Sequence, residues 1–377
     1  MSNKIEDKIA DLEERLDKTQ VNKHTMKSIV YIKAQLAKLR SQLVEIASSK
    51  SGGGGGFGIK KSGDAQVAFI GWPSVGKSSL LNLLTGGRTD SKVAAYDFTT
   101  LKAVPGMMEI ESAKIQLIDL PGIILGAATG KGRGKEILGA VRTADLILII
   151  ICFSPDGSLN LDDLNKIRKE LYDVNIRLNQ EPPRMKIKKR SKGGIGIASQ
   201  KNLTHLNDDM IKTIMNEYKI RNAAVFLYED LTPEQFIDGI MDNRRYIKEL
   251  VVINKLDLAS EDALKHINET MGDTDYITVS ALKKKNIQEL KRKIWDKLDL
   301  IRVYMKEPGK DPDMDEPMIL ERGSTIEDLC LRIHKDFVRL YRYAQIWGPS
   351  AKHPGQRFKG MEHEVEDGDV VMITLKK

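Results

Sequence analysis

The sequence predicts an α/β fold whose central domain is a doubly wound, mostly parallel sheet. Two features indicate this fold: several short, continuously apolar runs have the length of strands, and segments of helix or loop character separate them. Strands that alternate with helices form parallel sheets, and their ligand-binding loops follow the carboxyl ends of the strands. The predicted strands cover residues 67–70, 115–118, 146–152, 251–253 and 276–279.

Composition limits the class of protein. A chain of 377 residues predicts two to four domains, and its content of 41% hydrophobic and 30% charged residues suits a soluble protein with real cores. The longest apolar run, 146–153, is far too short for a bilayer, which needs about 20 residues, so no membrane partner is expected. Two distant cysteines, Cys152 and Cys330, are typical of a reduced, cytoplasmic protein. The net charge of +7 mildly favours a polyanionic partner.

The first fifty residues predict a helical hairpin. One apolar stripe steps by three and four residues from Ile5 to Leu16, and a second runs from Ile29 to Leu43. A polar break at 19–23 separates them. The stripes can pack on each other, with their lysines solvated, or serve a binding role, and the pattern leaves both open. Residues 51–63 begin with a run of glycines and are predicted to be a flexible linker.

A phosphate-binding loop follows the first predicted strand. Residues 71–78 fit the pattern GxxxxGKS and precede a predicted helix at 79–84, which is the context that such a loop requires. Backbone N–H groups would converge on phosphate oxygens at the helix amino end. Lys77 would reach the β- and γ-phosphates, and the Ser78 hydroxyl would ligate Mg²⁺. The predicted contacts are Gly71, Pro73, Ser74, Val75, Gly76, Lys77, Ser78 and Ser79.

Three further residues are predicted to act at the γ-phosphate and its Mg²⁺ ion. Asp119 and Gly122, in the segment DLPG, come at the end of a predicted strand: the carboxylate would hold a water bound to Mg²⁺, and the glycine N–H would contact the γ-phosphate. Thr100 is predicted to bind Mg²⁺ only when GTP is present, with Thr99 as the alternative. Lys77, Thr100 and Gly122 are therefore the predicted catalytic residues.

Selection of guanine is predicted from two later segments. Asn254, Lys255 and Asp257 come after the strand at 251–253, and the Asp257 carboxylate would accept hydrogen bonds from the guanine N1–H and amino group. Adenine offers no such pair, so an ATPase is disfavoured. After the strand at 276–279, backbone N–H groups would contact the guanine O6 in a loop made by Ser280, Ala281 and Leu282.

Together these segments give the chain a family resemblance. The set GWPSVGKSS, DFTTLKAVPG, DLPGII, NKLD and SAL resembles the developmentally regulated GTP-binding (DRG) proteins, within the Obg branch of translation-associated GTPases. The resemblance extends over nearly the whole chain and includes the glycine-rich segment 126–134, residues 142–145 and residues 352–356. It implies an N-terminal helical domain (1–50), a P-loop GTPase core (64–172 and 244–300), an inserted α+β domain of ribosomal-S5-like fold (173–243) and a C-terminal β-grasp TGS domain (301–377).

The insertion is also indicated by spacing, because the stretch from Asp119 to Asn254 is about twice as long as a minimal GTPase core needs. Within it, Lys186, Lys188 and Arg190 would share one face of a strand and could bind phosphates. An edge strand whose lysines prevent unwanted pairing explains the same pattern.

The resemblance also bears on catalysis. Ile123 stands where many GTPases have the glutamine that orients the attacking water, so slow intrinsic hydrolysis is expected. Arg133 is a candidate for stabilising charge in the transition state. Ser74 stands in the region where some related GTPases use an asparagine to hold K⁺, which leaves activation by K⁺ in doubt.

The sequence therefore predicts a Mg²⁺-dependent GTPase that alternates between GTP and GDP and acts in translation through the ribosome or RNA, not DNA. The alternative is an adaptor for RNA or protein in which the guanine nucleotide is mainly structural. The resemblance further implies that a helper protein binds the TGS domain or the core.

Overall fold

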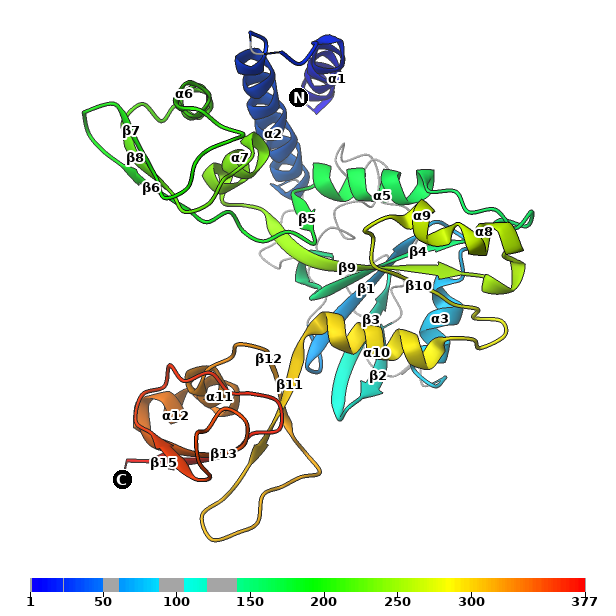
Figure 1. Ribbon diagram of the computed structural model, residues 1–377, viewed down its shortest axis with the longest axis vertical. Helices are drawn as coiled ribbons and strands as arrows, with labels where there is room; N and C mark the ends of the chain where they lie inside the picture. Colours follow the sequence, from blue (N-terminus) through cyan, green and yellow to red (C-terminus); the bar gives the residue numbers. More distant parts are fainter. Residues whose placement is uncertain (1, 23, 50–60, 88–104, 121–140, 377) are drawn as a thin grey trace. The chain divides into compact units, whose positions relative to one another are not determined.

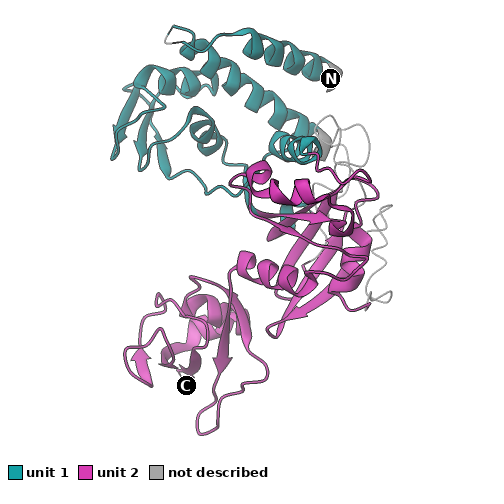
Figure 2. Cartoon of the chain, turned by 45° about the vertical axis from the view of Figure 1, so that its right-hand side comes forward, with its two compact units in different colours: residues 1–59, 122–143, 161–248 teal, residues 60–121, 144–160, 249–377 magenta. Residues whose placement is uncertain are grey.

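The computed structural model describes residues 2–22, 24–49, 61–87, 105–120 and 141–376. Contacts within the chain divide it into two compact units, which Figure 2 draws in separate colours. The first unit comprises residues 1–59, 122–143 and 161–248, and the second comprises residues 60–121, 144–160 and 249–377.

The main sheet has the strand order β10-β9-β4-β1-β3-β2, with β5 beside β9. β1 pairs in parallel with both β3 and β4, β10 pairs in parallel with β9, and β2 lies antiparallel to β3 at one edge. All five predicted apolar runs are strands, so the predicted α/β class is confirmed. The bounds are β1 Ala65–Gly71, β2 Pro105–Ile110, β3 Ala113–Asp119, β4 Leu146–Cys152, β5 Ile176–Leu178, β9 Arg245–Asn254 and β10 Tyr276–Thr278.

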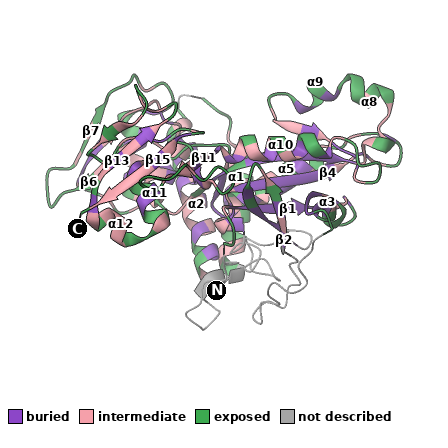
Figure 3. Cartoon of the chain, turned by 90° about the horizontal axis from the view of Figure 1, so that it is seen from below, coloured by how far each residue is buried: buried purple, intermediate pink, exposed green. Residues whose placement is uncertain are grey.

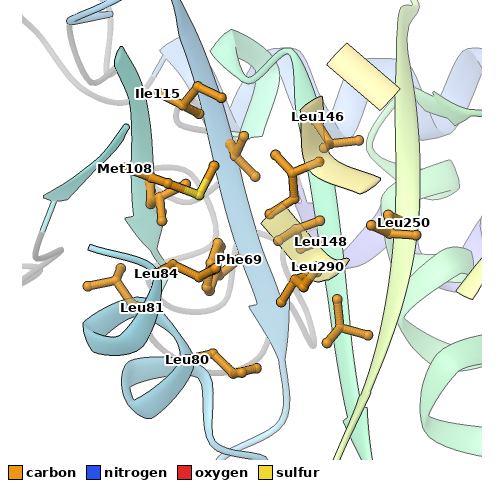
Figure 4. Packing of buried hydrophobic residues seen from close by; sticks show 14 of the residues in the cluster. Phe69, Leu80, Leu81, Leu84, Met108, Ile115, Leu146, Leu148, Leu250 and Leu290 are labelled. Carbon is orange, nitrogen blue, oxygen red and sulfur yellow. The ribbon is translucent and has the colours of Figure 1, made fainter. Parts of the chain in front are cut away.

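Helices α3 (Lys77–Leu84) and α10 (Ile287–Leu298) cover one face of the sheet in the second unit. In Figure 4 the leucines of α3 lie beside Phe69 and Met108, and Leu290 of α10 lies near Leu148. The neighbouring residues of β1 and β4, which point to the other face, are buried as well (Figure 3). Burial on both faces explains why these strands read as unbroken apolar runs. Three short helices follow β9: η1 Leu256–Leu258, α8 Glu261–Lys265 and α9 Ile267–Met271.

The first unit opens with the predicted hairpin. Helices α1 (Ser2–Lys18) and α2 (Met26–Ser49) pack through Leu12, Ile32 and Leu36, so the two apolar stripes do contact each other. Residues 51–60 of the predicted linker lie outside the described part of the chain.

A three-stranded sheet, in the order β6-β8-β7, occupies the predicted insertion. β6 lies antiparallel to β8, and β7 lies parallel to it. Figure 1 shows α2, α6 and α7 on one side of this sheet, where their apolar residues form a common core with it. The remaining bounds in this unit are α5 Asp162–Asp173, β6 Met185–Lys189, β7 Ile195–Ser199, α6 Asp208–Glu217, β8 Ala223–Leu227 and α7 Pro233–Met241.

The C-terminal part of the second unit is the predicted small α+β unit. Its five-stranded sheet has the order β12-β11-β15-β13-β14, and α11 begins with a capping box in which Thr325 and Asp328 exchange hydrogen bonds. Among the described residues, no helix combines the length and apolarity needed to cross a bilayer. The bounds are β11 Leu300–Met305, β12 Met318–Glu321, α11 Ile326–Ile333, α12 Lys335–Leu340, β13 Tyr341–Trp347, β14 Gln356–Phe358 and β15 Val370–Leu375.

Candidate functional site

The phosphate-loop sequence forms a tight turn between β1 and α3. Ser74 and Gly76 both have positive φ angles, of 65° and 94°. A Cβ atom on Gly76 would lie 2.3 Å from the Asn254 Nδ2 atom, so both backbone conformation and close approach require glycine here. No side chain caps the amino end of α3. Its first N–H groups are therefore available to an anion, as the motif predicts.

Lys77 is held inside this loop. Its side chain is buried, and Nζ donates hydrogen bonds to the carbonyl oxygens of Gly71 (2.9 Å) and Trp72 (3.0 Å). Burial lowers the pKa of the Lys77 ammonium, and the carboxylate of Asp119 opposes this effect. The ammonium is thus positioned at the turn where the motif places the β- and γ-phosphates.

Ser78 and Asp119 meet at the ends of adjacent structural elements. Ser78 lies in the first turn of α3, and Asp119 is the last residue of β3, whose pairing with β1 aligns it with Phe69. The Ser78 Oγ donates to the Asp119 Oδ2 atom at 2.6 Å. The other carboxylate oxygen, Oδ1, is buried and has no hydrogen-bond partner among the described residues.

This pair fits a Mg²⁺ ion. Mg²⁺ prefers hard oxygen ligands, it keeps several of its waters, and proteins hold it through one or two side chains together with substrate phosphates. A hydroxyl oxygen and a buried carboxylate oxygen without a partner supply that chemistry beside the phosphate loop. Within the described part of the chain, no cluster of three histidine, cysteine or acidic side chains offers an alternative metal site.

Asn254 joins three segments of the site. Only 2% of the residue is exposed. Its Nδ2 atom donates to the carbonyl oxygen of Val75 at 2.8 Å, and its Oδ1 atom accepts from the N–H of Ala281 at 3.0 Å. The side chain thus ties the phosphate loop to the loop at 280–282. Lys255, the next residue, has a positive φ of 59°, which turns the chain into η1.

Asp257 and Ser280 form a second link between the predicted guanine-binding segments. The Ser280 Oγ donates to the Asp257 Oδ1 atom and accepts from the N–H of Lys283 at 3.0 Å. Asp257 is exposed and Ser280 is buried, so the serine orients a carboxylate that solvent or a ligand can reach. Leu282 is 77% exposed at the tip of the same loop.

The structure therefore brings together most residues that the motifs single out, at the carboxyl ends of β1, β3, β9 and β10. Thr99, Thr100, Gly122, Ile123 and Arg133 lie outside the described residues.

Sequence reasoning missed the part played by Trp72. Its carbonyl oxygen holds Lys77, and its buried indole Nε1 has no partner among the described residues. The motif leaves this position unspecified, so no sequence signal marks it.

Three family models match consecutive parts of the chain. Residues 66–189 match the family model for the 50S ribosome-binding GTPase, and residues 192–300 match the model for the C-terminal region of that domain. Residues 301–375 match the TGS domain model. The predicted C-terminal TGS domain is thereby confirmed.

Several relatives match the chain over nearly its whole length. The chain is 54% identical to a GTP-binding protein of Methanocaldococcus jannaschii, over 99% of this chain and 93% of that protein. It is 45% identical to developmentally-regulated G-protein 3 of Arabidopsis thaliana, over 99% of each chain. It is 41% identical to developmentally-regulated GTP-binding protein 2 of Homo sapiens, over 99% of this chain and 100% of that protein.

Proposed function

Because the chain belongs to the developmentally regulated GTP-binding protein family, we propose that it is a Mg²⁺-dependent GTPase that switches its association with the ribosome. The proposal has two parts, hydrolysis of GTP and ribosome binding that depends on the bound nucleotide, and different observations support each part.

The observation that carries the first part is the Ser78–Asp119 pair beside the phosphate loop. The loop supplies N–H groups and the Lys77 ammonium for the phosphates, and the pair supplies the oxygen ligands for Mg²⁺. When bound, Mg²⁺ would neutralise charge on the β- and γ-phosphates. In the reaction, water attacks the γ-phosphorus in line, and the bond between this phosphorus and the β–γ bridging oxygen breaks. The products are GDP and inorganic phosphate. Lys77 would stabilise the charge that develops on the phosphate oxygens.

Specificity for guanine rests on Asp257, which Ser280 orients through a hydrogen bond. A carboxylate accepts both hydrogens on the guanine edge, whereas an adenine would leave it without partners. Slow turnover is part of the proposal, since Ile123 cannot orient a water molecule as a glutamine does. Acceleration would then come from a partner such as the ribosome.

The second part draws on the matched family and on charge. Residues 66–189 match the protein-family model of the 50S ribosome-binding GTPase. The chain also carries a formal net charge of +7, which suits a polyanionic partner. The helical hairpin, the inserted domain and the TGS domain would supply contacts besides those of the GTPase core.

Hydrolysis is tested by measuring phosphate release from GTP and from ATP, with Mg²⁺ and with EDTA. We expect Mg²⁺-dependent release from GTP at least tenfold faster than from ATP. Asp119→Asn removes the ligand charge and should reduce release at least tenfold, while Asp209→Asn, on an exposed acidic residue of α6, should leave it unchanged. ATP hydrolysed as fast as GTP, or full activity in Asp119→Asn, would contradict the proposal.

Gly122→Ala tests the switch separately. If the Gly122 N–H senses the γ-phosphate, this variant should still bind GTP but lose ribosome binding that depends on it. If the protein were an adaptor with a structural nucleotide, Gly122→Ala would bind ribosomes as well as the wild-type protein does.

A further inference from the structure

The basic stretch 184–192 is not used by the nucleotide site, and the structure places it on β6 at the edge of the three-stranded sheet. Lys186 and Lys188 are exposed on this strand, and Arg190 is exposed just after it. Alternation along a strand puts Lys186 and Lys188 on one face, with Met185 and Ile187 on the other.

The face that carries Met185 and Ile187 is covered by helices. These two side chains, together with Val225 of β8 and Ile195 and Ile197 of β7, pack in the core that α2, α6 and α7 share with the sheet. Register across the sheet follows from the pairing of Ile187 with Val225 and of Val225 with Ile197. The covered face therefore accounts for the apolar half of the alternating pattern.

Aromatic and small residues occupy the centre of the opposite face. Phe226 lies on the central strand, where it pairs with Lys186 on one side and with Ala198 on the other. Tyr228 follows the strand, and its N–H continues the ladder by donating to the carbonyl oxygen of Arg184 at 3.0 Å. Alternation puts Tyr228 on the same face as Phe226, about 7 Å further along. Both aromatic residues are partly exposed.

The face is open above β7. Gly196 pairs with Ala224, and a Cβ atom added to Gly196 would meet no atom within 4 Å. The Lys188 Nζ atom lies 5.9 Å from the centre of the Phe226 ring, within reach of a cation–π contact. Two aromatic rings thus stand on a low surface of glycine and alanine, with lysines along one side.

We propose that this face, which we call the platform (Lys186, Lys188, Gly196, Ala198, Phe226 and Tyr228), binds single-stranded RNA. Bases stack on Phe226 and Tyr228, and Lys186 and Lys188 contact the backbone phosphates. Stacking on aromatic side chains beside a cationic strip is the means by which proteins bind unpaired strands without reading their sequence. The choice of RNA as the polynucleotide rests on the proposed role at the ribosome.

Protection of an edge strand explains the lysines of β6, but it does not explain the rest of the platform. Such protection needs charges only on the edge. It gives no reason for two partly exposed aromatic residues, Phe226 on the central strand and Tyr228 directly after it, or for an open glycine on the neighbouring strand. The positive charge of the strip favours a polyanion, and the aromatic residues beside it favour unpaired bases.

The test is fluorescence anisotropy of a labelled, unstructured 12-nucleotide RNA with the full-length protein, in parallel with the same sequence as a duplex. We expect the wild-type protein to bind the single strand at least fivefold more tightly than the duplex. Phe226→Leu keeps an apolar side chain but removes the stacking ring, and should weaken binding about fivefold or more. Phe226→Tyr keeps the ring and should retain affinity within twofold.

The lysines are tested through the salt dependence of binding. Lys186→Gln combined with Lys188→Gln should lower the slope of log K against log salt by about 1.4, because each phosphate contact on a single strand contributes about 0.7. Lys212→Gln, on an exposed lysine of α6, is the matched control and should leave the slope unchanged. Binding of a fluorescent GDP analogue should be equal in all variants, which shows that the nucleotide site is intact, and an unchanged circular dichroism spectrum checks the secondary structure.

The platform is refuted if Phe226→Leu binds the RNA as tightly as the wild-type protein, or if Lys212→Gln changes the salt slope as much as the double lysine variant does. Equal affinity for duplex and single strand also refutes it, since stacking requires unpaired bases. This assay contains neither ribosomes nor GTP, so a negative result leaves the proposed GTP-dependent ribosome association standing, and loss of that association leaves the platform standing.

Discussion

Removing the Asn254 side chain should loosen the whole nucleotide site, even without a ligand. Asn254→Ala deletes the two hydrogen bonds that join the phosphate loop to the loop at 280–282. It also leaves the carbonyl of Val75 and the N–H of Ala281 without these partners in a site where Asn254 is 2% exposed. A net hydrogen bond contributes about 1 kcal/mol, and an unsatisfied buried group costs about 1–3 kcal/mol. We therefore expect Asn254→Ala to lower the free energy of unfolding of this site by about 2–4 kcal/mol.

Native-state hydrogen exchange measures this loss where it occurs. Amides of β1 and of the strand end at 251–254 should exchange about 30-fold faster or more in the variant, since 1.4 kcal/mol corresponds to a factor of ten. Asn216→Ala, on an exposed asparagine of α6, should change the free energy of opening at these amides by less than about 0.5 kcal/mol. A change in Asn254→Ala as small as that of Asn216→Ala would refute the view that this side chain holds the site together.

Two further substitutions test the backbone of the phosphate loop and an ion pair of the TGS domain. Gly76→Ala should lower GDP affinity, measured by calorimetry, at least tenfold, because the added Cβ atom would lie 2.3 Å from the Asn254 Nδ2 atom. The control is Gly86→Ala, which also has a positive φ but has open space around it and should leave GDP affinity unchanged. Equal effects of the two substitutions would contradict the steric explanation. Hydrogen bonds from the Arg302 side chain hold the pKa of Asp367 below its ordinary value. The ionised pair therefore stabilises the fold at any pH above the unfolded pKa of about 3.9. This contribution is lost as the pH falls through the folded pKa. In urea unfolding, Asp367→Asn should be less stable than the wild-type protein at neutral pH, and the difference should shrink as the pH falls below about 4; a difference independent of pH would contradict this assignment.

Strands were predicted correctly where burial requires a continuous run of apolar residues. Four of the five apolar runs lie on strands that are buried on both faces of the sheet, so nearly every position in them carries an apolar residue. The edge strand β2 was not predicted, because it begins with Pro105 and Gly106, two residues that usually argue against a strand. Proline is tolerated at the first position of an edge strand, and only the pairing with β3 reveals that this segment is one.

Contacts between residues that are far apart in the sequence could not be predicted from local sequence patterns. The motif identified Asn254 as a nucleotide-binding residue, but its hydrogen bond to Val75 spans 179 positions and no local pattern records it. The same holds for the buried ion pairs in which Asp238 contacts Arg177 at 2.6 Å and Arg244 at 2.5 Å. Charged residues are ordinarily exposed, so their burial follows only from the way the chain folds around them.

Co-sedimentation tests most directly whether GTP controls attachment of the protein to the ribosome, as we propose. The purified protein would be centrifuged with ribosomes in the presence of a non-hydrolysable GTP analogue, GDP or no nucleotide, at moderate and high salt. We expect the protein to pellet with ribosomes only when the GTP analogue is present, and to pellet more weakly at high salt. Equal sedimentation in all three nucleotide states would contradict the switch and favour the adaptor, and failure to sediment in any of them would contradict a role at the ribosome.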